Sequence, residues 1–373
     1  MNTTRLRKNK ILLGFQEGIM SKKKIVFTGG GTAGHVTPNI AIINELDHNQ
    51  WDIHYIGSKK GIEKELIEKI KVPYYQISSG KLRRYVDMEN IKDIFRVLKG
   101  CFEARRRLKK LKPQVVFSKG GFVSVPVIVA AKTLGIPTFI HESDLTPGLA
   151  NKISQRFATK IFTSFEETKE YFPKDKTMVI GSPIRKEILS GSNIKGRKFL
   201  GFNDHLPILT IMGGSLGAKR INETVRGSLK ALMTKYQIVH LCGKGNLDDT
   251  LKEVKGYKQY EYVNDELADI LATTNIVVTR GGSNAIFEFL ALKIPMLIIP
   301  LSKKQSRGDQ IMNAKSFENR GYSLTLEEET LSGKSLLASL ETLEKNKGKI
   351  VSAMENSIQG DALKIIVEEI NKI

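Results

Sequence analysis

A short strand that runs directly into a glycine-rich turn and then a helix constrains this chain more than any other feature. Residues 24–28 form the apolar run, residues 29–35 read Gly-Gly-Gly-Thr-Ala-Gly-His, and a helical pattern follows. Such a turn presents unpaired backbone N–H groups and a positive helix dipole to an anion, and the expected anion is a phosphate or pyrophosphate. The same order of apolar run and glycine-rich turn recurs at residues 208–218. We therefore expect two nucleotide-type half-domains that face one cleft.

Alternation of β-rich runs with helical patterns predicts parallel sheets covered by helices on both faces. In the first half we expect strands at 24–28, 53–57, 74–77, 115–118, 137–141 and 161–163. The helices expected between them lie at 37–48, 61–70, 89–111, 122–134 and 147–156. The second half is expected to form strands at 208–212, 237–242, 259–263, 275–279 and 296–300. The fold class is therefore α/β, with two Rossmann-like parallel-sheet domains.

Domain boundaries follow from the same pattern. We expect a first domain over residues 20–185 and a second over 186–356, with a C-terminal helix within about 357–373 that returns to the first. Residues 189–206 are rich in Gly, Ser, Asn and Lys, which predicts a linker or loose loop. Residues 1–19 are expected to be a non-structural leader, because the sequence before Met20 fits a translated ribosome-binding region.

Charge is concentrated in the first half of the chain. Residues 1–160 contain 29 lysines and arginines against 13 acidic residues, so most of the net charge of +20 lies there. This asymmetry favours an anionic partner on the N-terminal half. The two isolated cysteines, Cys101 and Cys242, fit a reducing compartment and exclude a Cys-rich metal site.

The most basic stretch, residues 81–112, also carries apolar residues at helical spacing. It can be interpreted as the core face of a helix or as a patch that inserts aromatic rings into a membrane beside anionic headgroups. Nucleic-acid binding is less favoured, because no base-reading module accompanies the charge. The residues of the candidate membrane patch are Lys81, Arg83, Arg84, Phe95, Phe102, Arg105, Arg106 and Arg107.

Two residues, one at the end of a glycine loop and one at the end of a predicted strand, are candidate bases. His35 ends the first glycine loop, and its near-neutral pKa suits a general base or a donor to the transition state. Glu142, in His-Glu-Ser-Asp, lies where a strand ends, on the edge at which open α/β sheets bind ligands. Gly120 and Gly121 follow another strand and form a further anion loop or an ordinary tight turn.

The spacing Gly29-x-Gly31-x-x-Gly34 also matches a dinucleotide fingerprint. That fingerprint requires a carboxylate after the second strand, and the sequence there is Gly57-Ser-Lys-Lys60. The two lysines could instead take a 2′-phosphate, so an NADP-dependent oxidoreductase stays an alternative.

In the second half, residues 280–288 follow a predicted strand and offer Ser283, Asn284 and Ala285 at a helix start. Glu288, one turn into that helix, could accept both hydroxyls of a ribose. The polar loop that ends in Asp309 and Gln310 suits sugar hydroxyls. The sequence contains no Asp-x-Asp pair, so a metal clamp on a diphosphate is not indicated.

Together these segments resemble the MurG family, bacterial glycosyltransferases that add N-acetylglucosamine to lipid I. The similar segments run in order from residue 24 to the C-terminus: 29–35, 118–122, 141–142, 181–185, 213–218, 280–288 and the loop of Gln310. The resemblance implies a glycosyltransferase-B fold with a central cleft. It implies inverting, metal-independent transfer from UDP-N-acetylglucosamine to the muramoyl O4 of lipid I, without a cofactor. The product, lipid II, serves peptidoglycan synthesis and hence cell shape and division.

The resemblance also implies site residues. Ser215 would contact the diphosphate, Val263 the uracil, Glu288 the ribose and Gln310 the sugar. The complete implied donor set is Thr32, Ala33, Gly34, Arg185, Ser215, Val263, Ser283, Asn284, Ala285, Glu288, Asp309 and Gln310. The implied loops for the acceptor pyrophosphate contain Gly30, Gly31, Gly120 and Gly121. His35 is the first candidate for the base and Glu142 the second.

This chain has Ser143-Asp144 where the family has Gln-Asn after His-Glu, and a carboxylate does not donate a hydrogen bond at neutral pH. The implied first domain binds the acceptor lipid and an anionic membrane, and the second binds the UDP-sugar. The implied location is peripheral, at the cytoplasmic face of the cell membrane. Two further alternatives are a different glycolipid-forming UDP-sugar transferase and a non-catalytic membrane adaptor.

Overall fold

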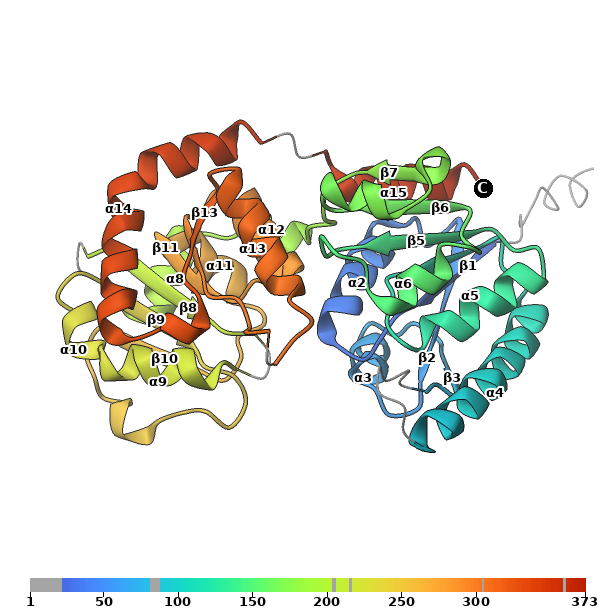
Figure 1. Cartoon of the computed structure of the whole chain (residues 1–373), viewed down its shortest axis with the longest axis horizontal. Coiled ribbons are helices and arrows are strands. Elements are labelled where there is room, and N and C mark those ends of the chain that lie inside the picture. The colour runs from blue at the N-terminus through green and yellow to red at the C-terminus, as the bar shows by residue number, and fades with distance from the viewer. Residues whose placement is uncertain (1–21, 81–87, 203–205, 215–216, 304, 358–359) are drawn as a thin grey trace, which may run out of the picture.

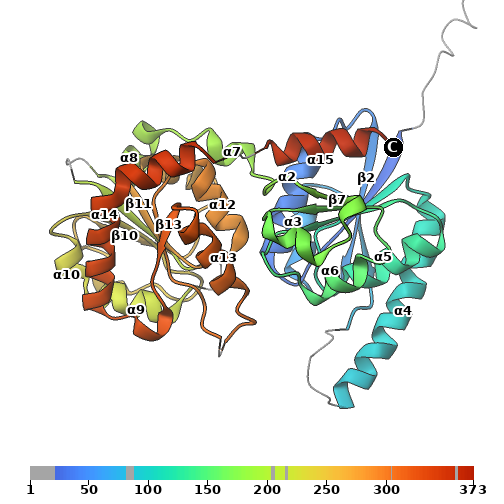
Figure 2. The same cartoon turned by 45° about the horizontal axis from the view of Figure 1, so that its top comes forward.

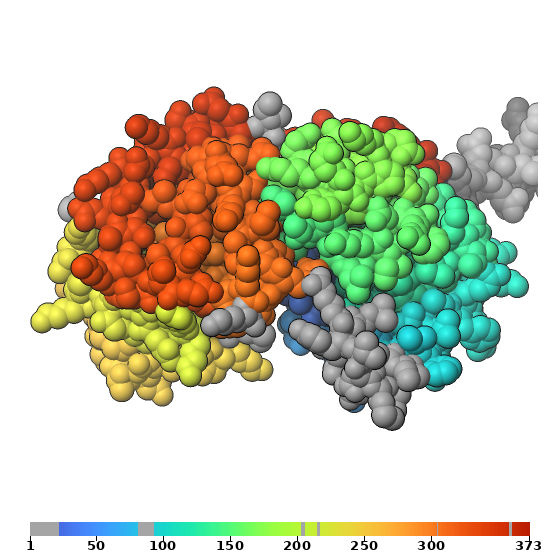
Figure 3. All heavy atoms as spheres, in the orientation of Figure 1, coloured from blue at the N-terminus to red at the C-terminus, as the bar shows by residue number. Residues whose placement is uncertain are grey.

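The computed structural model describes residues 22–80, 88–202, 206–214, 217–303, 305–357 and 360–373, apart from the side chains of 88–92. Within them the chain forms two lobes, each with a parallel sheet between helices (Figure 1). This arrangement confirms the predicted fold class. The lobes meet along a furrow that Figure 3 shows between the orange and green surfaces.

The first sheet has the strand order β3-β2-β1-β4-β5-β6-β7. Its strands are β1 (Lys23–Thr28), β2 (Trp51–Ser58), β3 (Tyr74–Ile77), β4 (Val115–Ser118), β5 (Thr138–Glu142), β6 (Lys160–Thr163) and β7 (Thr177–Val179). The register pairs Phe27 with Tyr55 on one side and with Phe117 on the other. The strand order thus reverses at β1, and ligands of such sheets bind beyond the carboxyl end of this position.

The second sheet repeats the plan with the order β10-β9-β8-β11-β12-β13. Its strands are β8 (Ile208–Met212), β9 (Gln237–Leu241), β10 (Tyr257–Tyr260), β11 (Ile276–Thr279), β12 (Met296–Ile298) and β13 (Ser323–Thr325). Here β8 occupies the reversal point. Central strands of both sheets are almost fully buried, as expected of parallel sheets covered on both faces.

Helices cover both sheets and follow the predicted alternation. Those of the first lobe are α2 (Thr37–Glu45), α3 (Ile62–Lys69), α4 (Met88–Leu111), α5 (Ser124–Thr133) and α6 (Leu149–Ser154). The connection and the second lobe contain α7 (Lys186–Leu189), α8 (Asn193–Leu200), α9 (Lys219–Gly227), α10 (Leu229–Leu232), α11 (Leu267–Thr273), α12 (Ser283–Ala291), α13 (Asp309–Asn319) and α14 (Gly333–Glu355). Short 3₁₀ turns include η1 (Ala33–His35) and η2 (Glu167–Tyr171).

The C-terminal helix α15 (Ala362–Asn371) lies across the first lobe, far in sequence from the strands that it covers (Figures 1 and 2). Leu363, Ile366 and Ile370 are buried in the same core cluster as β1 and β2. The Trp51 indole N–H donates to Asn371 Oδ1 at 2.8 Å. Helix α15 therefore completes the first core.

The expectation of a loose loop over residues 189–206 is wrong, because α8 occupies its middle. The Ser192 hydroxyl accepts from the Lys195 N–H at the start of α8, and Gly201 ends the helix in the left-handed region. A methyl group on Gly196 would overlap the Asp269 carbonyl oxygen of α11. Small and polar residues that suggested a loop therefore serve as helix caps and as a close helix contact.

Candidate active site

Two glycine loops of the first lobe pack against each other beyond the ends of β1 and β4. Gly121 has a φ of +86°, and a methyl group there would overlap the Gly30 carbonyl oxygen. Only glycine permits both the left-handed backbone and this close approach. The fold thus brings together the four glycines predicted to hold the acceptor pyrophosphate: Gly30, Gly31, Gly120 and Gly121.

A buried carboxylate that the sequence analysis missed binds the first of these loops. Glu63, in the first turn of α3, accepts hydrogen bonds from the Gly31 N–H at 3.2 Å and the Ser58 N–H at 3.1 Å. Its side chain is fully buried. One N–H of the predicted anion loop is therefore already bound by an internal anion. An acidic residue in the first turn of the helix after β2 was the available signal.

His35 lies in η1, between the first glycine loop and α2. Its Nδ1 atom lies 3.1 Å from Thr32 Oγ1. Burial and then the Lys119 charge lower the pKa of His35, while Asp144 and the Gly30 backbone oppose the shift. A lowered pKa leaves the imidazole neutral at neutral pH, which is the form that can accept a proton.

Lys119 is buried at the end of β4, and the sequence analysis did not predict a role for its side chain. Its ammonium contacts His141 Nδ1 and the Ser143 hydroxyl. Burial lowers the pKa of Lys119 to about 7, against the opposing charges of Glu142 and Asp144. Because His141 Nδ1 accepts from the ammonium, its Nε2 carries the proton toward the Gly181 carbonyl oxygen, 3.3 Å away.

Glu142, the second candidate base, ends β5 and is buried. One carboxylate oxygen accepts from the Asp144 N–H at 3.0 Å, and the other accepts from the Gly148 N–H and the Asn151 amide at 3.0 and 2.9 Å. Burial and then Asp144 raise the pKa of Glu142. One oxygen is thus bound to a donor in the loop after β5 and the other to two donors at the start of α6, which is an arrangement suited to fixing this loop.

The second lobe contributes α12, which begins directly after β11 and reaches the first glycine loop. The Asn284 amide donates to the Gly34 carbonyl oxygen at 2.8 Å, so two predicted donor-site residues from different lobes meet. Asn284 Oδ1 is buried and lacks a hydrogen-bond partner among the described residues. The predicted residues Ser283 and Ala285 flank it in the first turn of α12.

Arg185 and Glu288, two further predicted donor-site residues, form an ion pair. Arg185 Nε and Nη2 both lie 3.0 Å from Glu288 Oε1. Burial raises the pKa of Glu288, and Arg185 opposes this shift. Arg185 also lines an interdomain cavity of about 450 Å³ together with Val263 and residues of α2. Val263, predicted for the uracil, and Arg185, the ion-pair partner of the predicted ribose residue Glu288, therefore border one space.

The predicted sugar-binding residues begin α13. Gln310 Oε1 accepts a hydrogen bond from the Leu301 N–H at 3.0 Å. Asp309 Oδ2 lies 3.6 Å from Arg307 Nη2. Asn313, one turn further, was missed. Its amide donates to Asp144 Oδ1 and to the Gly281 carbonyl oxygen, both at 3.0 Å. Asp144, where this chain departs from the family pattern, thus accepts a hydrogen bond from the opposite lobe.

Helix α4 shows which apolar residues in the region of the candidate membrane patch are exposed and which are buried. Phe95 and Phe102 are 67% and 71% exposed, and Ile94 and Leu98 lie on the same exposed face, whereas Ala104, Leu108 and Leu111 are buried. The core-face interpretation is therefore wrong for the exposed four. Figure 2 shows α4 projecting from the first lobe.

The basic residues of this patch differ in their contacts. Arg105 donates to the Thr133 carbonyl oxygen at 3.0 Å, Arg107 stacks 4.5 Å from the Tyr75 ring centre, and Arg106 is exposed. Lys81, Arg83 and Arg84 lie outside the described residues, as does the predicted diphosphate residue Ser215.

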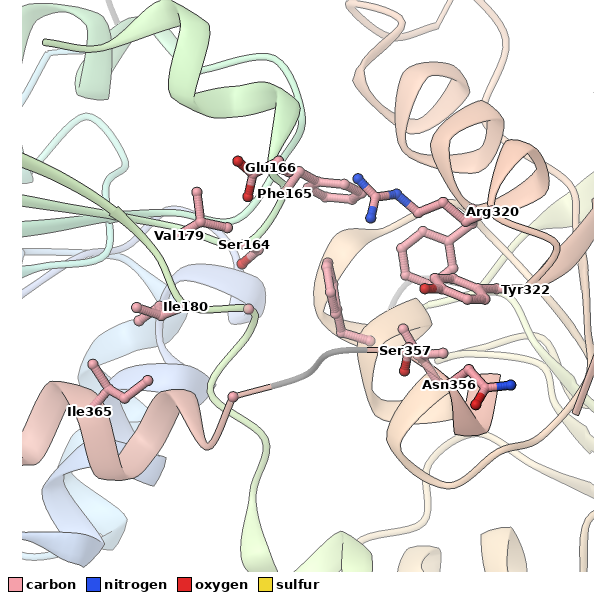
Figure 4. A pocket seen from close by; sticks show the side chains of 15 residues that line it. Ser164, Phe165, Glu166, Val179, Ile180, Arg320, Tyr322, Asn356, Ser357 and Ile365 are labelled. Atoms are coloured by element: carbon pink, nitrogen blue, oxygen red, sulfur yellow. The ribbon is translucent and has the colours of Figure 1, made fainter. Parts of the chain in front are cut away.

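A larger cavity, of about 560 Å³, lies on another side of the interdomain connection. Phe165 of the first lobe and Arg320 and Tyr322 of the second border it (Figure 4). It is lined by none of the predicted site residues that the structure describes. Among the described residues no cluster suited to a metal ion occurs, and no described helix is long and apolar enough to cross a membrane.

Two Rossmann-like lobes place glycine loops and a histidine on one side of a cleft and the buried Glu288, paired with Arg185 of the connection, on the other. This is the arrangement of a two-domain enzyme that binds a nucleotide-sugar. The chain belongs to glycosyltransferase family 28. It matches the N-terminal domain of that family over residues 25–163 and the C-terminal domain over residues 208–370. This membership confirms the resemblance and the glycosyltransferase activity predicted from sequence.

Curated relatives carry one enzyme name, UDP-N-acetylglucosamine--N-acetylmuramyl-(pentapeptide) pyrophosphoryl-undecaprenol N-acetylglucosamine transferase. One from Bacillus cereus, numbered 2, is 59% identical over 350 residues, which cover 94% of this chain and 99% of the relative. One from Shouchella clausii is 57% identical with the same coverage. These matches do not favour the NADP-dependent oxidoreductase alternative.

Solved structures share the fold of this chain. The crystal structure of Acinetobacter baumannii MurG is 25% identical with a TM-score of 0.75, and the match covers 94% of this chain and 100% of that one. A UDP-GlcNAc 2-epimerase from Neisseria meningitidis, 15% identical with a TM-score of 0.65 and covering 94% and 100%, shares the fold alone.

Proposed function

We propose that this protein transfers N-acetylglucosamine from UDP-N-acetylglucosamine to the muramoyl O4 hydroxyl of lipid I, giving lipid II for peptidoglycan synthesis. The observation that carries the proposal is the identity of 59% over 94% of the chain to a relative named for this transfer. The site geometry supports it, because the candidate base and the candidate donor residues face each other from the two lobes. We assign residues 20–185 and the C-terminal helix to the acceptor domain, and 186–356 to the donor domain.

The donor site is proposed to lie in the cavity beside Arg185 and Val263. Glu288 would exchange its contact with Arg185 for the ribose hydroxyls, since a carboxylate accepts two hydrogen bonds from a diol. Asn284 Oδ1 is buried and has no hydrogen-bond partner among the described residues. It is therefore available to accept a hydrogen bond from the bound UDP-sugar. Ser215, Asp309 and Gln310 complete the proposed diphosphate and sugar contacts.

His35 is the proposed base. It removes the O4 proton while O4 bonds to the anomeric carbon and the bond from that carbon to the β-phosphate oxygen breaks, which inverts the configuration. UDP leaves with the bonding electron pair, and loop N–H groups and helix N-termini stabilise its charge without a metal. Glu142 is the weaker candidate, because both of its oxygens already accept hydrogen bonds.

The acceptor is proposed to bind the glycine loops of the first lobe, with its lipid in a membrane. The exposed apolar face of α4 lies on that lobe, and Arg106 flanks it. Aromatic rings and cations on one helix suit the interface of an anionic membrane. We propose a peripheral location at the cytoplasmic face of the cell membrane, where the lipid-linked acceptor and soluble UDP-sugar meet.

The direct test is transfer of radiolabelled N-acetylglucosamine from UDP to a short-chain lipid I analogue in the presence of EDTA. We expect label in the lipid fraction. Transfer that needs added divalent metal would contradict the metal-independent mechanism. Absence of transfer under all metal conditions, with UDP still bound, would contradict the acceptor and direct the search to other glycolipids.

A further inference from the structure

Glu63 is a buried carboxylate that the mechanism above does not use. It lies in the first turn of α3, and its side chain is fully excluded from solvent. Burying a carboxylate is costly unless hydrogen bonds replace those it made to water. Backbone and hydroxyl donors of two other segments supply these hydrogen bonds, and the start of a helix also favours a negative charge. The fold is therefore built to hold this side chain inside the first lobe.

Each oxygen of the Glu63 carboxylate is bound by a different segment. Oε2 accepts a hydrogen bond from the Gly31 N–H, in the loop after β1, at 3.2 Å. Oε1 accepts from the Ser58 N–H, at the end of β2, at 3.1 Å, and from the Ser58 hydroxyl. Since these donors lie outside α3, the carboxylate does more than cap its own helix. It joins the first glycine loop to the end of β2.

Two glycines make room for the Glu63 carboxylate. A methyl group on Gly30 would lie 2.5 Å from Glu63 Cδ, and one on Gly61 would lie 2.2 Å from the same atom. Gly30 also touches the second glycine loop, because a methyl group on Gly121 would lie 2.2 Å from the Gly30 carbonyl oxygen. Gly30 therefore packs closely against both the carboxylate and the second loop, so the position of the carboxylate affects how the two loops meet.

The loop that Glu63 binds leads directly into the turn of His35. Its first residue is fixed as well, because the Tyr55 hydroxyl of β2 donates to the Gly29 carbonyl oxygen at 2.8 Å. The His35 N–H donates to the Thr32 carbonyl oxygen at 3.1 Å, so η1 begins immediately after the loop. A methyl group on Gly29 would lie 2.8 Å from the His35 carbonyl oxygen. The main chain of the His35 turn thus packs on the loop that the carboxylate holds.

We propose that Glu63 is a positioning residue of the acceptor site, whose carboxylate holds the first glycine loop against the second and thereby sets the position of the His35 turn. The inference rests on the proposed function, in which these loops bind the acceptor pyrophosphate and His35 removes the O4 proton. A carboxylate is required because it presents an acceptor oxygen to both segments. An amide of the same size would turn its NH₂ group toward one of the N–H donors.

The kinetic test compares wild type with Glu63→Gln in the full chain, following transfer to the lipid I analogue and binding of UDP. Glu63→Gln should lower kcat by about 10- to 100-fold, as expected when a charge-assisted hydrogen bond is lost and a reacting group is displaced. The Kd for UDP should stay close to wild type, because the proposed uracil, ribose and diphosphate residues lie in the second lobe. Glu65→Gln, at an exposed glutamate in the same turn of α3, is the matched control and should behave as wild type.

Amide hydrogen exchange tests the contact without turnover. Peptides that contain Gly31 should exchange faster in Glu63→Gln than in wild type or Glu65→Gln, while peptides from β8 should exchange alike in all three. Unchanged exchange around Gly31 with unchanged kcat would overturn the inference. A parallel loss of UDP binding and faster exchange in β8 would also overturn it, because Glu63 would then support overall stability.

The wild-type protein provides a further measurement in case Glu63→Gln fails to fold. Its Gly31 N–H should exchange more slowly than an unprotected amide by NMR, and exchange at the unprotected rate would overturn the inference. Wild-type enzyme that transfers nothing to lipid I would contradict the proposed function. The exchange measurements would still decide whether Glu63 holds the loop.

Discussion

The two lobes share one topology and differ in what they place at the same edge of the sheet. In the first lobe the loop after the central strand β1 is bound by the Glu63 carboxylate and lies beside buried Lys119. In the second lobe the loop after β8 contains Gly214, where an added methyl group would meet none of the described residues within 4 Å, and the predicted ribose residue Glu288 of α12 pairs with Arg185 of the connection. The fold thus supplies the ligand edge, and side chains determine which ligand each edge can take.

The two lobes also differ in net charge and in the apolar side chains that they expose. Most of the net charge lies in residues 1–160, and α4 of the first lobe exposes a continuous apolar face. A basic lobe with exposed aromatic rings suits a lipid-linked anion. A nearly neutral lobe with an interdomain cavity suits a soluble nucleotide-sugar. Under the proposed function, the two lobes of one topology would bind two substrates in different phases, a lipid-linked acceptor and a soluble nucleotide-sugar.

The largest expected effect comes from the base of the first lobe. His35→Ala should lower kcat by about 100- to 10,000-fold, the usual contribution of general-base catalysis, with little change in the KM for UDP-N-acetylglucosamine. Steady-state transfer kinetics measure both constants. His48→Ala, at a histidine on another part of the same lobe, should behave as wild type. Unchanged turnover in His35→Ala would remove this histidine from the mechanism.

The two glycine loops can be compared by adding the same methyl group to each. Both Gly121 and Gly214 have positive φ, so alanine at either costs about 1 to 2 kcal/mol of strain. Gly121→Ala also overlaps the Gly30 carbonyl oxygen, whereas Gly214→Ala meets open space. Denaturant unfolding should show the larger loss of stability for Gly121→Ala. Gly135→Ala, with positive φ and no neighbour within 4 Å, is the control in the first lobe.

A carboxylate of the second lobe should affect donor binding alone. Glu288→Gln keeps the size of the side chain and removes its charge, so the KM for UDP-N-acetylglucosamine should rise roughly tenfold or more, as for a lost charge-assisted hydrogen bond. The KM for the lipid acceptor should stay close to wild type. Glu341→Gln on α14 is the control, and equal donor affinity in both variants would refute the assignment.

The smallest expected effect concerns the exposed face of α4. Replacing Phe95 and Phe102 by serine removes apolar surface that would enter the membrane, and should weaken binding to anionic vesicles by several-fold. Vesicle sedimentation measures this. Ile194→Ser, at an 81% exposed residue of the second lobe, should leave binding unchanged. Equal binding by all three proteins would show that α4 is not the membrane contact.

The sequence predicted the positions of strands better than it predicted the contacts between side chains. The apolar runs that became β1, β4 and β8 are continuous and bounded by glycine, so their positions were predictable. The three-residue strands β7 and β13 were missed because polar residues interrupt them, whereas the equally short β12 was predicted from the apolar run at 296–300. Helix α8 was missed because its capping and close-contact residues are the same types that form loops.

Four features could be derived from the amino-acid sequence alone: the alternation of strands and helices, the two glycine loops, the basic first half and the residues that place the chain in its family. These features are local, so they can be read without knowing which segments meet. Three contacts became evident only in the folded protein: Glu63 binds the first glycine loop, Lys119 lies beside the turn of His35, and Asn313 donates a hydrogen bond to Asp144. Each contact joins segments that only the folded chain brings together, and burial then sets its electrostatic effect.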